Sequence, residues 1–274
     1  MSAVPVRPRA ALAVLLASCA GLVAFGWPLL ADADWTLEQS RTAPMNLAGL
    51  LLVVLVVVLA ELTDDGLDAR SVAMLGVLAA MGAALRPLGA GTAGIETMFF
   101  LLVIAGRVFG PGFGFVLGNV AIFSSALLTG GVGPWLPYQM MAAAWVAAGA
   151  GLLPHARGRA ELALLAAYGA VSSVLFGLAL NLSFWPFTLG TDTDVSFQAG
   201  DAVGDNLSRL VVFSLTTSLG WDIGRAITTV ALVLVTGPFL LRTFRRAARR
   251  ARFEAPASDR TTDTVAAGSV STDG

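Results

Sequence analysis

Residues 104–119 read IAGRVFGPGFGFVLGN, which places one arginine, one proline and five glycines inside an otherwise apolar region. Because Pro111 breaks helical hydrogen bonding, the pattern predicts one helix that ends near Arg107 and another that begins near Gly110. Three glycines of the second helix recur every four residues, so they share one face and let another backbone approach closely. These glycines are Gly110, Gly114 and Gly118. Because an arginine is costly in lipid, we interpret the stretch as a tight cytoplasmic hairpin in a packed membrane bundle.

The composition is that of an all-α polytopic membrane protein. The 274 residues are 56% hydrophobic and 13% charged, about half the charged share of a soluble domain. Apolar runs such as Val53–Leu59 do not alternate with polar residues, as the strands of a membrane β-barrel do. A net charge of −1 gives no nucleic-acid signature.

The chain lacks the motifs of metal and nucleotide chemistry. Its only cysteine and histidine, Cys19 and His155, form neither an intrachain disulfide nor a His/Cys metal cluster. It has no Gly-x-x-x-x-Gly-Lys-Ser/Thr phosphate loop. We therefore expect no cofactor, and if the protein pumps a substrate, another protein supplies the energy.

A membrane helix needs roughly 20 mainly apolar residues, and about eight segments are candidates, although Ile95–Arg107 is short. They are Ala10–Leu30, Met45–Leu62, Ser71–Leu88, Ile95–Arg107, Gly110–Thr129, Trp135–Leu153, Ala160–Leu182 and Trp221–Leu241. With an inside N-terminus, twelve arginines lie inside and four outside. This bias predicts a cell-membrane protein with both termini cytoplasmic. We expect Asn206–Leu219 to be a partial or interfacial helix, because a full span there would put the basic C-terminal end outside.

The expected organisation has three parts. Residues 1–70 hold two N-terminal membrane helices, residues 71–252 a six-helix core, and residues 253–274 a polar, disordered cytoplasmic tail. Leu16–Cys19 is similar to a bacterial lipoprotein processing box. The favoured interpretation is a first membrane helix, because the apolar run continues to Leu30.

Three stretches of the core carry a family likeness. They are LGVLAAMGAALRP from Leu75, FFLLVIAGRVFGPGFGFVLGN from Phe99, and GGVGPWLPYQMMAAAWVAAGAG from Gly130. The Phe-Gly-Pro-x-x-Gly-x-x-x-Gly pattern at Phe109–Gly118 is the most specific part, and a weaker likeness resumes at Gly220–Arg225. Over about 71–252 the chain resembles the substrate-binding membrane subunit (S component) of energy-coupling-factor (ECF) vitamin transporters.

The resemblance implies a six-helix core with an outward-facing site for a small vitamin-like ligand, and no enzyme activity. It also implies a transmembrane coupling subunit and two ATP-binding subunits as partners in the lipid bilayer. In that family an Ala-x-x-x-Ala pattern on the first core helix contacts the coupling subunit. Two stripes match here, Ala79 with Ala83 and Ala80 with Ala84, the second extended by Gly76. The alternative for both stripes is internal packing.

Ten polar or aromatic residues near the expected outer half are candidates for substrate binding, because such groups at membrane depth need a partner or a task. They are Arg86, Glu96, Asn119, Trp135, Tyr138, Gln139, Asn181, Trp185, Asp222 and Arg225. Structural alternatives remain for several of them. Glu96 could be a helix N-terminal acid, and Asn119 could bond a neighbouring backbone. Trp135 could mark the headgroup belt, Arg86 could anchor at the interface, and Asp222 with Arg225 could be an ion pair within one helix.

Two other functions have some support in the sequence. A membrane prenyltransferase would hold magnesium and a diphosphate with an Asp-Asp-x-x-Asp pattern, which occurs at Asp64–Asp68, and an Asp-x-x-x-Asp pattern, which occurs at Asp201–Asp205. The predicted topology places these two motifs on opposite membrane faces, which argues against that enzyme. A stand-alone secondary carrier often shows internal repeats, and the two halves of this chain show no convincing repeat.

Overall fold

The computed structural model describes residues 8–30, 45–53, 55–56, 59, 69–89, 92–188 and 193–253. Every regular element in these residues is helical. The named elements are α1 (Pro8–Phe25), η1 (Trp27–Leu30), α3 (Ala69–Leu85), η2 (Arg86–Gly89), α4 (Phe99–Phe109), α5 (Pro111–Thr129), α6 (Leu136–Leu152), α7 (Gly158–Thr188), α8 (Val203–Thr217) and α9 (Leu219–Phe253). The described residues between 45 and 59 are helical as well.

Four stretches are long and apolar enough to cross a membrane. They are Ala69–Gly89, Pro111–Thr129, Gly158–Phe187 and Leu219–Arg249. Ala11–Phe25 and Phe99–Phe109 are shorter apolar helices. An all-helical chain with several such stretches has the character of a multi-pass membrane protein.

Two helices extend beyond their predicted ends. α7 continues to Thr188, so the outer connection that was expected to begin at Ser183 begins with helix. α9 runs from Leu219 through Phe253 and contains Pro238. Its last two turns are rich in arginine and alanine, which favour helix, so Phe253 is helical although we expected the tail to begin there. Residues 254–274 lie outside the described residues, as does Asp64–Asp68.

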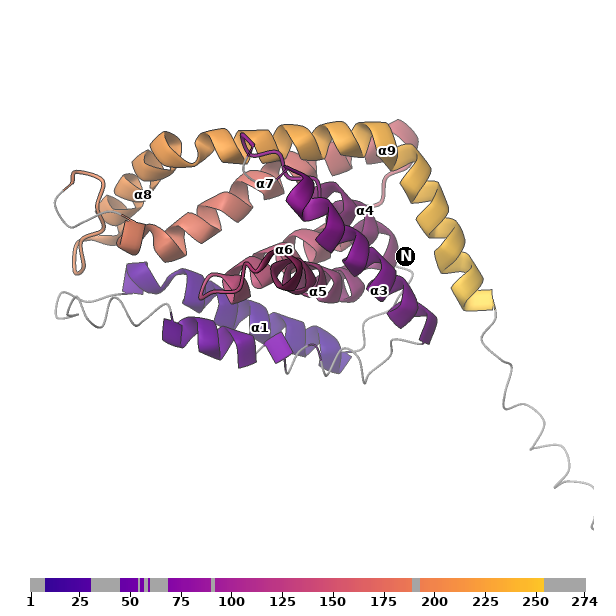
Figure 1. The fold of residues 1–274 in the computed structure, drawn as a ribbon, viewed down its shortest axis with the longest axis horizontal. Helices are drawn as coiled ribbons and strands as arrows, with labels where there is room; N and C mark the ends of the chain where they lie inside the picture. Colours follow the sequence, from indigo (N-terminus) through magenta and orange to yellow (C-terminus); the bar gives the residue numbers. More distant parts are fainter. Residues whose placement is uncertain are drawn as a thin grey trace, which may run out of the picture.

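The helices do not form a parallel bundle. α5 packs most extensively against α6, and α7 against α9. In Figure 1, α5 and α6 are seen nearly end-on, whereas α7 and the first part of α9 run across the view. The two pairs therefore cross at a steep angle, and α9, which contains Pro238, bends along its length (Figure 1).

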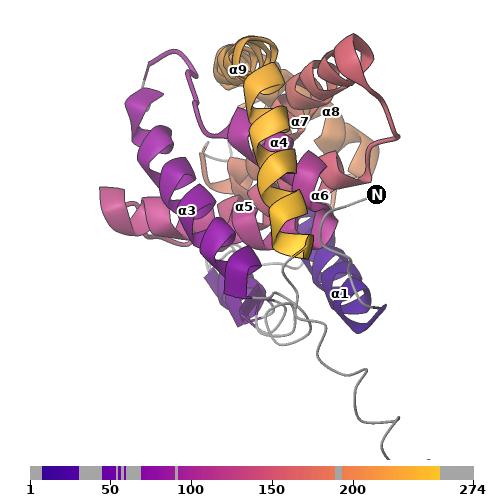
Figure 2. The same ribbon diagram turned by 90° about the vertical axis from the view of Figure 1, so that its right-hand side faces the viewer.

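The short helix α4 lies at the centre of the fold (Figure 2). It contacts α5, α6, α7 and α9, and ten of its eleven residues are buried. An 11-residue helix is only about 17 Å long, too short to cross a bilayer. Its neighbours shield it on all sides, which explains how a short apolar segment can be stable there.

The hairpin of residues 104–119 forms close to the predicted positions. α4 ends at Phe109 and α5 begins with Pro111, while Gly110 between them has φ 104°, a conformation that glycine adopts without strain. A β-carbon on Gly118 would lie 2.5 Å from the backbone nitrogen of Ala144. Gly114 faces the backbone of α6 in the same way, 2.7 Å from the Ala147 carbonyl carbon. These glycines allow α5 and α6 to pack backbone to backbone.

The N-terminal helix α1 is part of the packed structure. The Trp145 indole nitrogen donates to the Ser18 hydroxyl at 3.0 Å, and a β-carbon on Gly21 would lie 2.9 Å from the same indole. Phe25 meets Tyr138 edge to face at 5.1 Å. Cys19 is exposed on this helix, between two residues that hold α1 against α6.

Candidate ligand-binding site

Arg225 is the centre of a buried ion network where the first turns of α9 pack against the middle of α7. Its Nε donates to Glu96 Oε2 at 2.8 Å, and its Nη1 donates to Asp222 Oδ1 at 2.8 Å. Nη1 also donates to the Ser173 carbonyl at 2.9 Å. Because Glu96 precedes α4 and Ser173 lies on α7, the guanidinium ties three parts of the chain together.

The environment of Arg225 satisfies the guanidinium without a ligand. It lies 5.5 Å from the ring centre of Phe99 and 5.0 Å from that of Phe176, where cation–π attraction adds to the ion pairs. Gly177 faces the Asp222 carboxylate so closely that a β-carbon would collide with it. The network therefore acts as a structural clamp between α4, α7 and α9.

Asn181 extends the polar chain to α8. Its amide nitrogen donates to Ser214 at 3.0 Å and to Ser218 at 2.6 Å. The Ser218 hydroxyl in turn donates to Asp222 at 3.4 Å. Asn181 is thereby joined to the Arg225 network rather than left open for a ligand.

Arg86 and Gln139 form a separate pair. Arg86 Nη2 donates to Gln139 Oε1 at 2.9 Å, which joins η2 to the first turn of α6. Trp135, one turn earlier, is 45% exposed. Gln139 and Trp135 therefore do not face one common ligand, because Gln139 binds an arginine and Trp135 faces outward.

Trp185 belongs to a small second core. Its side chain is buried, and its indole nitrogen donates to the Val195 carbonyl at 2.7 Å. Phe197 meets it edge to face at 5.5 Å, and Leu210 of α8 packs on the same cluster. This packing fixes the connection between α7 and α8 against the bundle.

Asn119 and Tyr138 are both fully buried. The Asn119 amide nitrogen donates to the Phe115 carbonyl at 2.8 Å, as expected for the backbone alternative. Its Oδ1 and the Tyr138 hydroxyl have no hydrogen-bond partner among the described residues. A buried polar atom without a partner is costly, so these two atoms and the Ser125 hydroxyl, which also has no partner, are the ones a bound molecule or water could satisfy.

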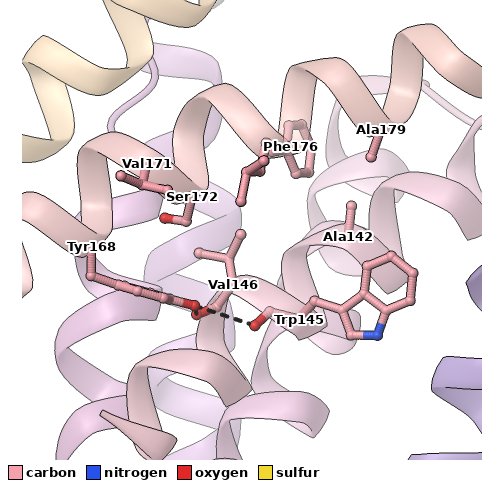
Figure 3. A pocket seen from close by; sticks show the side chains of 9 residues that line it. Ala142, Trp145, Val146, Tyr168, Val171, Ser172, Phe176 and Ala179 are labelled. Carbon is pink, nitrogen blue, oxygen red and sulfur yellow. Dashed lines mark hydrogen bonds between the residues drawn. The ribbon is translucent and has the colours of Figure 1, made fainter. Parts of the chain in front are cut away.

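A cleft of about 200 Å³ opens between α6 and α7 (Figure 3). Its lining is almost entirely apolar and consists of Ala142, Trp145, Val146, Tyr168, Val171, Ser172, Leu175, Phe176 and Ala179. The Tyr168 hydroxyl donates to the Val146 carbonyl at 2.7 Å across the cleft wall. Aromatic walls with few polar groups suit a small organic molecule.

Tyr138 closes the α6–α7 seam above this cleft. It lies one helical turn before Ala142, and its ring meets Phe184 of α7 edge to face at 5.2 Å. Ala142 and Ala179 line the cleft, so the contact between Tyr138 and Phe184 bounds the cleft on the side toward the C-terminal end of α7.

The residues that line this cleft were not among the ten candidates. None of those ten lines the described cleft, whereas Trp145, Tyr168 and Phe176 do. Rings inside apolar helices look like ordinary core residues, and nothing in the spacing sets them apart. The one available signal was the pair of hydroxyl-bearing residues, Tyr168 and Ser172, in the middle of an apolar span.

A second ion network lies at the opposite end of α4. Arg107 Nε donates to Glu161 Oε1 at 2.8 Å, and its Nη1 donates to the Leu153 carbonyl at 2.7 Å. Arg245 of α9 donates to the same carboxylate oxygen at 2.6 Å. The Arg107 side chain is only 8% exposed, because Glu161 supplies the partner that allows burial.

The two small-residue stripes of α3 have different environments. Ala79 and Ala83 are buried with Leu75 and Gly82 on the face toward the bundle. Gly76, Ala80 and Ala84 are exposed, and a β-carbon on Gly76 would meet nothing within 4 Å. The stripe of Ala79 and Ala83 therefore takes part in internal packing, whereas the stripe of Gly76, Ala80 and Ala84 lies exposed on the outer face of α3.

The described residues contain no group of three His, Cys, Asp or Glu side chains that could hold a metal. Asp201, in one of the acidic motifs, pairs with Arg209 at 2.7 Å.

Comparisons of the chain with known protein families, curated proteins and solved structures found no match.

Proposed function

We propose that this chain is the substrate-capture subunit of an ECF-type micronutrient importer, as its sequence resemblance implies. In this proposal α3, α4, α5, α6, α7 and α9 are the six-helix core, preceded by two further membrane helices, with both termini cytoplasmic. A coupling subunit and two ATP-binding subunits drive release of the ligand inside the cell. The protein itself carries out no covalent chemistry.

The exposed stripe of Gly76, Ala80 and Ala84 is the observation that carries the proposal. α3 already packs on the bundle through its other small residues, Ala79 and Ala83, so fold stability does not require a smooth outer face. Small residues let a second membrane helix approach closely. An exposed stripe of small residues on an apolar helix is the surface that a helix of the coupling subunit would need for close approach.

The cleft between α6 and α7 supports the ligand-binding half of the proposal. Glu96, Asp222 and Arg225 are already paired with one another and Arg86 binds Gln139, so the charged candidates offer little to a charged ligand. The aromatic cleft and unpartnered atoms such as Asn119 Oδ1 and the Tyr138 hydroxyl instead favour a small, flat, mostly uncharged molecule. In this proposal the ligand enters from the outer face, where Tyr138 moves away from Phe184.

Tryptophan on the exposed stripe tests the coupling interface. We expect Ala80→Trp and Ala84→Trp each to reduce co-purification with a co-expressed ECF coupling subunit at least tenfold, because a large side chain separates the helices. Ligand binding should survive. The matched control is Ala167→Trp, an exposed alanine on α7 away from the stripe. Intact co-purification of both α3 variants, or equal loss in the control, would refute the interface.

Removal of one hydroxyl tests the role of Tyr138. We expect Tyr138→Phe to leave thermal stability unchanged or higher, because it removes a buried unpartnered group. Ligand binding should weaken about five- to tenfold if that hydroxyl bonds the ligand. Tyr168→Phe is the control, and it should lower stability by about 0.5–1.5 kcal/mol because it loses the bond to Val146. The role fails if Tyr138→Phe lowers stability and leaves ligand affinity unchanged.

A further inference from the structure

The C-terminal turns of α9 carry a basic stripe. Arg242, Arg246 and Arg249 are four and three residues apart, so they lie on one helix face, and all three are exposed. Arg245 lies beside them, with its side chain 44% exposed. We call these four residues the α9 arginine stripe. The sequence has no acidic residue from position 223 to position 253.

Packing on the opposite face fixes the direction of the stripe. Leu241, Phe244 and Ala248 are buried, and Phe244 lies 5.8 Å from the Phe109 ring at the end of α4. The bend of α9 turns this segment across the end of α4, and its last turns reach beyond the other helices (Figure 1). The arginines are therefore held on the outside of the bundle in a defined orientation.

The positive charge of the stripe is not compensated within the described residues. Glu161 pairs with Arg245, but the same carboxylate oxygen also pairs with Arg107. One negative charge is therefore shared by two arginines. Arg242, Arg246 and Arg249 make no ion pair with any described residue. An anion from outside the described residues would complete the charge balance at this end of α9.

The position of the stripe along α9 indicates which kind of anion it binds. The apolar part of the helix ends at Leu241, and the stripe begins at the next residue. From Arg242 to Arg249 the helix rises about 10 Å, comparable with the headgroup layer that flanks the roughly 30 Å hydrocarbon core. Guanidinium groups bind phosphate in a bidentate fashion. The chain contains arginine and no lysine.

We propose that the α9 arginine stripe binds the phosphate headgroups of anionic phospholipids in the adjacent membrane leaflet. The bound lipids would hold the end of α9 at the membrane surface and fix the depth of the ion network of Arg107, Glu161 and Arg245. This lipid site is independent of transport, and it would exist even if the protein carried no micronutrient.

Native mass spectrometry of the full chain tests this site. Purified protein is equilibrated with mixed phosphatidylglycerol and phosphatidylcholine vesicles, and retained lipids are counted. Wild type should retain phosphatidylglycerol preferentially. Arg242→Gln/Arg246→Gln should weaken this retention about fivefold for each arginine removed. The control Arg157→Gln/Arg159→Gln removes two exposed charges beside Glu161 and should behave like wild type.

Any one of four results would overturn the proposal. Equal loss in both double variants would show an effect of net charge alone. Displacement of phosphatidylglycerol by millimolar inorganic phosphate would assign the stripe to a soluble anion. Unchanged lipid retention in Arg242→Gln/Arg246→Gln, or capture of an acidic protein in place of lipid, would exclude a headgroup site. Matching melting temperatures of the variants and wild type would show that lost lipid does not reflect unfolding.

Discussion

Replacing Arg225 with methionine is expected to lower the free energy of unfolding by about 3–5 kcal/mol, the usual cost of breaking a buried ion pair on one side. The change would leave Asp222, whose side chain is 6% exposed, and Glu96 without their cation. The Ser173 carbonyl would also lose its donor. Unfolding in detergent micelles, followed by tryptophan fluorescence, measures the loss.

The control for this prediction is Arg209→Met. Arg209 pairs with Asp201, whose side chain is 44% exposed, so its loss should cost at most about 1 kcal/mol. The triple variant Arg225→Met/Glu96→Gln/Asp222→Asn should regain much of the stability, because no unpaired charge remains. If Arg225→Met unfolds as wild type does, the clamp between α4, α7 and α9 does not exist.

Gly106→Ala is expected to lower stability by about 3 kcal/mol or to prevent folding, because it overpacks a rigid contact. A β-carbon at this position would collide with the backbone carbonyl of Ala147. Backbone atoms cannot move aside as a side chain can, so α4 would have to shift away from α6. Thermal melting of purified protein and the yield of monodisperse protein both report the effect.

Gly76→Ala is the matched control for Gly106→Ala. Both glycines lie inside helices, but a β-carbon on Gly76 would meet nothing within 4 Å. This change should leave stability unchanged or raise it by about 0.5–1 kcal/mol, because alanine is the better helix former. Similar losses in the two variants would mean that helix propensity, and not close packing of α4 against α6, decides the outcome.

Local features of the fold could be predicted from the sequence. The hairpin follows from Pro111 and Gly110, which act through backbone geometry that their own residues determine. Runs of apolar residues locate the helices for a similar reason. The steep crossing of the α5–α6 pair over α7 and α9 depends on contacts between distant segments, and no local pattern encodes it.

The partners of the charged residues could not be predicted. Arg225 binds Glu96, which is 129 positions away, and Arg107 binds Glu161, 54 positions away. Sequence spacing identified only the pair of Arg225 with Asp222, which lie three residues apart on one helix. The candidates that were expected to converge on a ligand therefore include several that neutralise one another.

The rotation of each helix about its own axis could not be predicted from the sequence either. The sequence offers two equivalent alanine stripes on α3, and only the packing of α3 shows that Ala79 and Ala83 face inward while Ala80 and Ala84 face outward. The cleft also depends on rotation, because it forms where faces of α6 and α7 meet without filling the space between Trp145 and Phe176.

Native mass spectrometry of the purified chain tests most directly whether it captures a small molecule inside the bundle. The account predicts a discrete mass shift from one tightly bound organic ligand that is released on unfolding and is weakened by Tyr138→Phe. Spectra that show only lipid and detergent, for the chain alone and for the chain purified with a coupling subunit, would contradict it.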